Sequence, residues 1–111
     1  MPHRLLAANT FAEFLSAIAH PRRIQIIEEL SSGETDVGSL KKALGISHSN
    51  VSQHLAVLRG HRVVTERREG RHVIYRLRSS ALAEWIVDGM RFVPEATREV
   101  DQVRDALRRE G

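Results

Sequence analysis

The sequence of 111 residues contains no cysteine. That absence excludes disulfides, thiolate metal sites, iron–sulfur clusters and cysteine nucleophiles. The apolar runs are short, so we expect no segment to span a membrane. The N-terminal stretch MPHRLLAANTFAEF lacks the apolar centre of a signal peptide, and we therefore expect a cytoplasmic protein.

The chain also has little excess charge, with 17 Lys and Arg against 14 Asp and Glu. A net charge of +3 is too small to indicate a nucleic-acid partner by itself, so the distribution of charge must decide. Apolar residues make up 41% and charged residues 28%, as in an ordinary globular protein. We expect one domain spanning residues 1–111.

Two helices are predicted at the start of the chain. Apolar residues recur at helical spacing over about 8–19. Pro21 suits the first turn of a second helix, and Gly33 marks its end. The expected buried stripe of this second helix is Ile24, Ile27 and Leu30.

A pair of short helices should follow. Asp36 is a candidate N-cap for one helix, and Gly45 stops it. Ser47 is a candidate N-cap for the next, whose buried face is predicted to be Val51, Leu55 and Leu58. Two helices joined by a short turn with glycine are typical of a helix-turn-helix.

The next segment predicts a β-hairpin. Residues 63–65 favour a strand, 67–71 a turn, and His72–Leu77 alternate apolar with polar side chains apart from Ile74. From Ser80 onward the chain is helical again, with an expected kink or break at Pro94. The fold class is therefore mainly α with a β-hairpin wing: a winged helix-turn-helix of order α-α-α-α-β-β-α.

The final helix carries an apolar repeat of about 3.5 residues, which is typical of a helix packed along another helix. Its members are Leu82, Ile86, Gly89, Val93, Ala96, Val100, Val103 and Leu107. We predict a homodimer interface built from this helix and the first one. The interface residues would be Phe11, Phe14, Leu15, Leu82, Trp85, Ile86, Gly89 and Val93.

The histidines of the fourth predicted helix do not indicate a metal or catalytic site. His48 and His54 are six positions apart and point away from each other, whereas chelating pairs on a helix are four apart. No strand–turn–helix elbow holds a serine nucleophile. We expect no enzymatic activity, and we expect His54 to be a hydrogen-bonded structural residue.

A DNA-binding surface fits this segment better, because the N-terminal part of such a helix contacts bases. Between Arg59 and Arg78 there are seven arginines and two glutamates, a net charge of +5. Arg71, beside the wing glycine, suits a minor groove, and the others suit phosphate. A merely solvated hairpin is the alternative for these arginines, and a simple N-cap is the alternative for Ser47. The predicted DNA contacts are Ser47, His48, Ser49, Asn50, Ser52, Gln53, Arg59, Arg67, Arg68 and Arg71.

The segments FLSAIAHPRRIQIIEEL and DVGSLKKALGISHSNVSQHLAVLRGHRVVTERREGRHVIYRL resemble the ArsR/SmtB group of bacterial winged-helix repressors, over roughly 11–93. The resemblance implies a homodimer that binds an inverted-repeat DNA operator and blocks transcription. Arg23 lies where the family has an arginine opening the second helix. We expect it to form an internal salt bridge, with a phosphate contact as the alternative.

The resemblance does not extend to the family's sensing sites. Asp36 and Gly38 occupy the positions of the Cys-x-Cys pair of the arsenic and cadmium sensors, and no histidine follows His72. We predict a repressor without these sites and with no metal or cofactor; the inducer is left open. The alternatives are a metal-responsive repressor with a non-standard His/Asp/Glu site and a winged-helix protein–protein adaptor.

Overall fold

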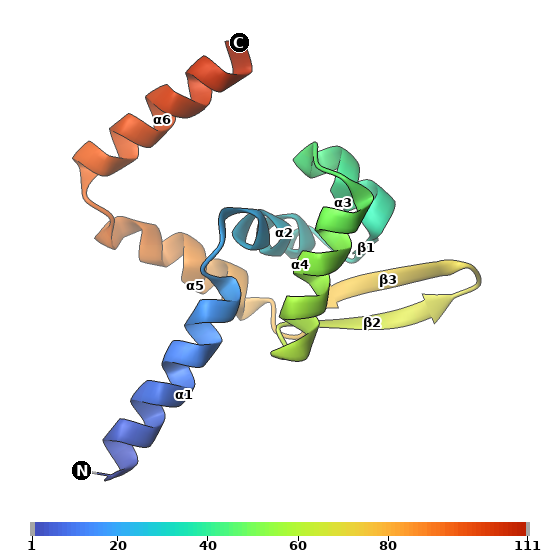
Figure 1. Cartoon of the computed structure of the whole chain (residues 1–111), viewed down its shortest axis with the longest axis horizontal. Helices are drawn as coiled ribbons and strands as arrows, with labels where there is room; N and C mark the ends of the chain where they lie inside the picture. Colours follow the sequence, from blue (N-terminus) through green and yellow to red (C-terminus); the bar gives the residue numbers. More distant parts are fainter. Residues whose placement is uncertain (1, 111) are drawn as a thin grey trace. The chain divides into compact units, whose positions relative to one another are not determined.

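The computed structural model describes the backbone of residues 2–110 and the side chains of residues 7–98 and 101–108. The chain divides after Ser80 into two compact units. The first unit has the order α1 (Pro2–Ile18), α2 (Pro21–Ser31), β1 (Thr35–Asp36), α3 (Val37–Leu44), α4 (His48–Gly60), β2 (Val64–Glu69) and β3 (His72–Leu77) (Figure 1).

The ends of α3 and α4 form where the predicted capping residues lie. Asp36 Oδ1 accepts a hydrogen bond from the Ser39 amide at 2.8 Å, and Ser47 Oγ accepts one from the Asn50 amide at 3.1 Å. Each bond satisfies a backbone N–H that has no partner within its helix. Gly45 ends α3 with φ 68°, in the left-handed region that glycine enters without steric cost. The predicted helix-turn-helix is therefore confirmed.

The core of the first unit lies between α2, α3, α4 and the base of β2. Val51, Leu55 and Leu58 are completely buried, as predicted for the inner face of α4. In α2 the buried stripe is shifted, because Ile26 is completely buried while Ile24 is only partly buried. The fully buried side chains are Ile26, Ile27, Leu40, Val51, Leu55, Leu58 and Val64.

The wing differs from the predicted hairpin in two ways. The turn is shorter than expected, because β2 continues to Glu69 and pairs with His72, which leaves only Gly70 and Arg71 in the loop. Gly70 has φ 64°, at the first loop position, where two-residue hairpins favour glycine. The charged run that resembled a turn is a solvated strand projecting beyond the core.

The second difference is a strand that the sequence did not reveal. The two residues of β1 pair antiparallel with β3, Thr35 with Tyr75 and Asp36 with Ile74, and the strand order is β1-β3-β2. A strand of two residues has no periodicity by which a sequence could reveal it. The sheet thus has three strands, where the sequence predicted a two-stranded hairpin.

The second unit consists of α5 (Ala81–Gly89), the short 3₁₀ helix η1 (Met90–Phe92) and α6 (Glu95–Glu110). The predicted break at Pro94 is confirmed. Val93 is extended, with φ −79° and ψ 126°, as a residue before proline must be to avoid the proline ring. No helix in the described part of the chain is long and apolar enough to cross a membrane.

Candidate nucleic-acid interface

The solvent side of α4 carries the polar side chains predicted to contact DNA. Five of them are exposed and Ser52 is partly buried, whereas the opposite side of the helix faces the core. Ser47 serves as the N-cap of α4, and its hydroxyl also lies 3.2 Å from that of Ser49. The exposed set is Ser47, His48, Ser49, Asn50 and Gln53.

The wing presents two exposed arginines near its tip. Within the described residues, neither Arg68 nor Arg71 has a hydrogen bond or ion pair. Their guanidinium groups are therefore available to an anion. Arg71 lies in the loop itself, and Arg68 lies near the end of β2.

A groove of about 450 Å³ joins the start of α4 to the wing. His48 and Ser52 line it from α4, Arg71 and His72 from the wing, and the start of α3 closes another side. The structure thus brings together residues of α4 and of the wing that the sequence placed on separate elements. Asp36 also lines the groove, so Arg71 is its one full positive charge, set beside an exposed polar helix face. An arginine beside hydrogen-bonding side chains is suited to a phosphate backbone.

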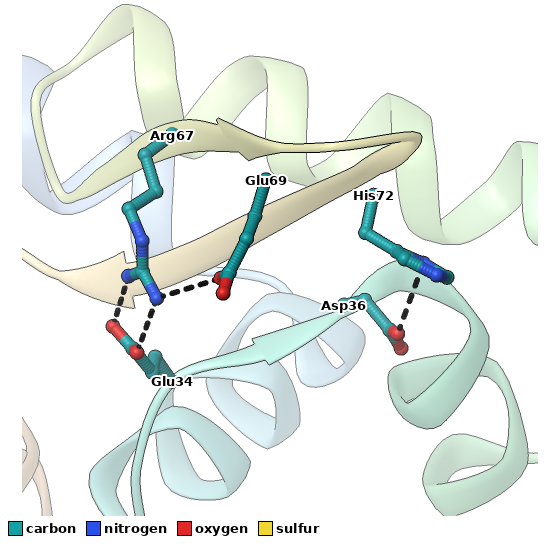
Figure 2. Close-up of polar contacts among 5 residues, drawn as sticks. All are labelled: Glu34, Asp36, Arg67, Glu69 and His72. Atoms are coloured by element: carbon teal, nitrogen blue, oxygen red, sulfur yellow. Dashed lines mark hydrogen bonds and ion pairs between the residues drawn. The ribbon is translucent and has the colours of Figure 1, made fainter.

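Two other arginines that were predicted to contact phosphate already form ion pairs with carboxylates of the chain. Arg59 Nη1 lies 2.5 Å from Glu66 Oε1, which ties the end of α4 to β2. Arg67 forms a two-pronged ion pair with Glu34 and a further one, at 3.1 Å, with Glu69 (Figure 2). Hydrogen bonding to Arg67 lowers the pKa of Glu34, and the same contact raises the pKa of Arg67.

His54 is a structural residue, as predicted. Its Nδ1 accepts a 3.4 Å hydrogen bond from Arg23 Nε, and its ring centre lies 4.4 Å from that of His20. Burial lowers the pKa of His54, and the neighbouring His20 and Arg23 lower it further. His54 Nδ1 can accept this hydrogen bond only while it carries no proton, so the contact requires the neutral imidazole.

The prediction that Arg23 forms an internal salt bridge is wrong among the side chains that the structure describes. Its guanidinium donates to the carbonyl of Ala17 at 2.9 Å and of Ser16 at 3.4 Å, besides the contact to His54. The last carbonyls of α1 have no partner within the helix, so Arg23 satisfies them and links α1 to α4. His20 caps α2 by accepting from the Arg22 amide at 3.1 Å, a role that its place before a proline could have indicated.

Within the described residues, no group of three His, Asp or Glu side chains lies close enough to hold a metal ion. Asp36, at a position of the family's Cys-x-Cys pair, is the N-cap of α3. Its other carboxylate oxygen lies 4.0 Å from His72 Nδ1.

Several residues predicted for a dimer interface leave apolar surface exposed. On α1, Phe14 and Leu15 are partly buried and Phe11 is 50% exposed. In the second unit, Leu82, Ile86, Gly89 and Val93 are partly buried and Trp85 is 48% exposed; the side chain of Val100 lies outside the described residues. The sequence prediction missed exposed apolar side chains between these positions, which are Val87 and Phe92.

Comparison with known proteins supports the same interpretation. Residues 20–66 match the family described as "Bacterial regulatory protein, arsR family". The HTH-type transcriptional regulator Rv0081 of Mycobacterium tuberculosis is 36% identical over 101 residues, which cover 90% of this chain and 89% of that protein. Nodulation protein NolR of Rhizobium meliloti is 38% identical over 81 residues, 73% of this chain and 66% of NolR.

Solved structures of similar proteins share the fold. NolR from Sinorhizobium fredii aligns with a TM-score of 0.75 at 32% identity, covering 84% of this chain and 93% of that one. The transcriptional repressor BigR from Xylella fastidiosa aligns with a TM-score of 0.71 at 30% identity, covering 84% and 95%. The chain therefore belongs to the ArsR/SmtB family of winged helix-turn-helix transcriptional repressors, whose members bind DNA and are not enzymes.

Proposed function

We propose that this protein represses transcription by binding an inverted-repeat operator as a homodimer, with α4 in the major groove and the wing beside it. The observation that carries the proposal is the groove in which His48 and Ser52 of α4 meet Arg71 of the wing. One duplex surface can meet both elements there, because the helix proposed to read bases and the wing cation Arg71 line the same concavity.

The exposed side chains suit different parts of the duplex. Gln53 offers the donor–acceptor pair that recognises adenine, and Asn50 offers the same chemistry one helical turn earlier. Ser49, Ser52 and His48 are hydrogen-bonding groups near the start of α4, where the helix dipole favours phosphate oxygens. Arg71 suits a minor groove, and Arg68 suits a phosphate.

Arg59 and Arg67 were also expected to contact phosphate. In the free protein each is engaged by a carboxylate, Glu66 for Arg59 and Glu34 for Arg67. Either arginine would have to exchange that carboxylate for a phosphate on binding.

The homodimer is supported by the apolar surface on two elements. Phe11 on α1 and Val103 and Leu107 on α6 are each at least half exposed. An isologous interface would cover such surface and would place two copies of α4 about one turn of DNA apart. The whole chain then acts as a single DNA-binding domain within the cytoplasm.

We further propose that repression does not depend on the cysteine or last-helix histidine sites used by the family's metal sensors. The sequence has no cysteine and no histidine after His72. A repressor with a different His/Asp/Glu metal site is the second candidate, and dialysis followed by zinc addition tests it directly. Zinc-dependent release of bound DNA would support that candidate.

Selection of bound duplexes from a random pool tests the proposed function. The expected result is an inverted repeat whose affinity falls steeply with salt, since neutralised phosphates release counterions. Sedimentation of the complex should give two chains per duplex. Recovery of no preferred sequence, with weak salt-independent binding, would instead favour a protein–protein adaptor.

A further inference from the structure

We infer that two carboxylates beside β1 hold the wing in position, and that Arg67 orients the wing instead of contacting DNA. This inference rests on the proposed function, because it concerns the wing of that DNA-binding surface. It assigns a positioning role to Glu34 and Arg67, to which Asp36 adds only when His72 is protonated.

The two carboxylates lie at either end of the short strand. Glu34 immediately precedes β1, and both of its oxygens accept from the Arg67 guanidinium, one of them at 2.6 Å from Nη2. Asp36 ends β1, and its Oδ2 lies 4.0 Å from His72 Nδ1, an ion pair when His72 is protonated. Figure 2 shows that the two contacts reach different strands of the wing, β2 and β3.

The surroundings of Arg67 make it a poor phosphate ligand. Glu69 approaches the same guanidinium at 3.1 Å, so one positive charge is shared between two carboxylates. Arg76 also acts on Glu34, so these four side chains carry a net charge of zero and a phosphate that approached Arg67 would meet no excess positive charge. Binding there would require the loss of a two-pronged, charge-assisted pair of hydrogen bonds.

Arg68 provides the contrast. Successive side chains of a strand point to opposite faces, so Arg68 and Arg67 face different sides of the wing. Within the described residues Arg68 has no ion pair, whereas Arg67 has two carboxylate partners. Adjacent arginines therefore have separate roles, one available to DNA and the other fixing the strand on which both lie.

Ion pairs to the rest of the first unit form on both faces of the wing. Arg67 binds Glu34 on one face, while Glu66, on the opposite face of β2, binds Arg59 of α4. These pairs are exposed, so each is expected to be weak in free energy. Their effect on binding comes from position, because the strand they fix carries the loop with Arg71 at its end.

A pair of substitutions with opposite charge effects tests the inference. Glu34→Gln adds one unit of positive charge and Arg67→Gln removes one. If only net charge mattered, the first would strengthen DNA binding and the second would weaken it. If the pair positions the wing, both should weaken binding to a selected operator duplex by roughly two- to fivefold, the range of an exposed ion pair.

Two further properties separate positioning from direct contact. The double variant Glu34→Gln with Arg67→Gln should bind no more weakly than either single variant, because residues of one pair are not additive. The dependence of log affinity on log salt should keep its slope in Arg67→Gln, since no phosphate contact is lost. Reversal of the pair, Glu34→Arg with Arg67→Glu, should restore affinity to near that of the unmodified protein.

Glu28→Gln on α2 is the matched control, because it removes the same charge from an exposed glutamate away from the wing. It should bind the operator at least as tightly as the unmodified protein. Tighter binding by Glu34→Gln, or a salt slope reduced by about one in Arg67→Gln, would overturn the positioning role. Failure of the unmodified protein to bind any duplex would refute the proposed function instead.

Discussion

Gln53 lies exposed on α4, between the buried residues Val51 and Leu55. Gln53→Ala is expected to cost about 1–3 kcal/mol of operator binding and to relax preference at one base pair in each half-site. Titration against the operator and against single-base variants measures both effects. Gln102→Ala, which removes an exposed amide from α6, is the control; unchanged affinity and preference in Gln53→Ala would exclude Gln53 as a base reader.

Arg71 is the cation in the loop of the wing. Arg71→Ala should weaken DNA binding and reduce the salt slope by about 0.9, because one positive charge held against the duplex no longer releases counterions. Arg108→Ala on α6 removes the same charge and should leave the slope unchanged. Equal reductions in both variants would favour a diffuse effect of net charge over a specific role of the wing.

The lowered pKa of His54 makes the stability of the fold depend on pH. Burial is the largest cause of this lowered pKa, and the charges of His20 and Arg23 come second. The folded protein disfavours the protonated form, so the unfolded chain binds more protons around the ordinary value of 6.5. This contribution to stability is present above pH 6.5 and is lost as pH falls through the lower folded value.

Replacement of His54 by glutamine tests that linkage. An amide oxygen can still accept from Arg23, but it does not titrate. The Tm of His54→Gln should therefore fall less between about pH 7.5 and about pH 5 than that of the unmodified protein. His61→Gln, on a residue that contacts neither Arg23 nor His20, is the control. An identical pH dependence in His54→Gln would reject the assignment.

At the scale of the elements, the cap that Ser47 forms can be separated from its proposed contact with DNA. As the N-cap of α4 it accepts from the Asn50 amide, so Ser47→Ala should cost about 1 kcal/mol of unfolding free energy. Ser47→Asp should keep the cap and the stability, while its charge repels a phosphate at the start of α4. Denaturant unfolding and DNA titration distinguish the roles; an Asp variant that binds DNA normally would leave Ser47 as a cap alone.

The helices were predictable because local rules decide them. Asp36, Gly45 and Ser47 mark the helix-turn-helix by their capping chemistry alone. Strand β2 was less predictable than β3, because its residues are charged on both faces and carry no apolar alternation past Val64. The two-residue β1 depends entirely on its partner β3, which lies far along the chain.

The residues of the candidate site could be proposed from the sequence, but which of their side chains are free to contact DNA could not. The sequence placed ten side chains in the DNA-binding set, and their contacts with DNA stay predictions. Partners distant in sequence could not be read from it: Glu34 precedes Arg67 by 33 residues, and Arg23 precedes His54 by 31. Such pairs arise from packing, which decides whether a charged side chain faces an anion or another residue of the chain.

At the scale of the whole molecule, the proposed dimer interface can be tested by one substitution. Ile86 lies in α5 among exposed apolar side chains that include Val87 and Met90. Ile86→Glu would bury a charge in the proposed interface, at a cost of roughly several kcal/mol unless the subunits separate. Sedimentation should show a monomer with lost cooperative operator binding.

Glu84→Gln on the same helix is the control, since it alters an exposed charge without adding one to the apolar seam. A folded Ile86→Glu protein that stays dimeric and binds DNA as tightly as before would place the interface elsewhere. That the whole chain forms one domain, and that it forms a dimer, both stay predictions.

The two-residue loop at Gly70 and Arg71 limits how the wing can change in evolution. Because side chains alternate between the faces of a strand, inserting one residue into β2 or β3 would turn every later side chain to the opposite face. An insertion before Arg67 in β2 would break its contact with Glu34, and one before Leu77 in β3 would turn Leu77 out of the core. Insertion of one residue in each strand, on the loop side of the Arg67–Ile74 pair, preserves both. Wings of this kind should therefore lengthen or shorten across species by even numbers of residues, with odd changes absorbed as bulges.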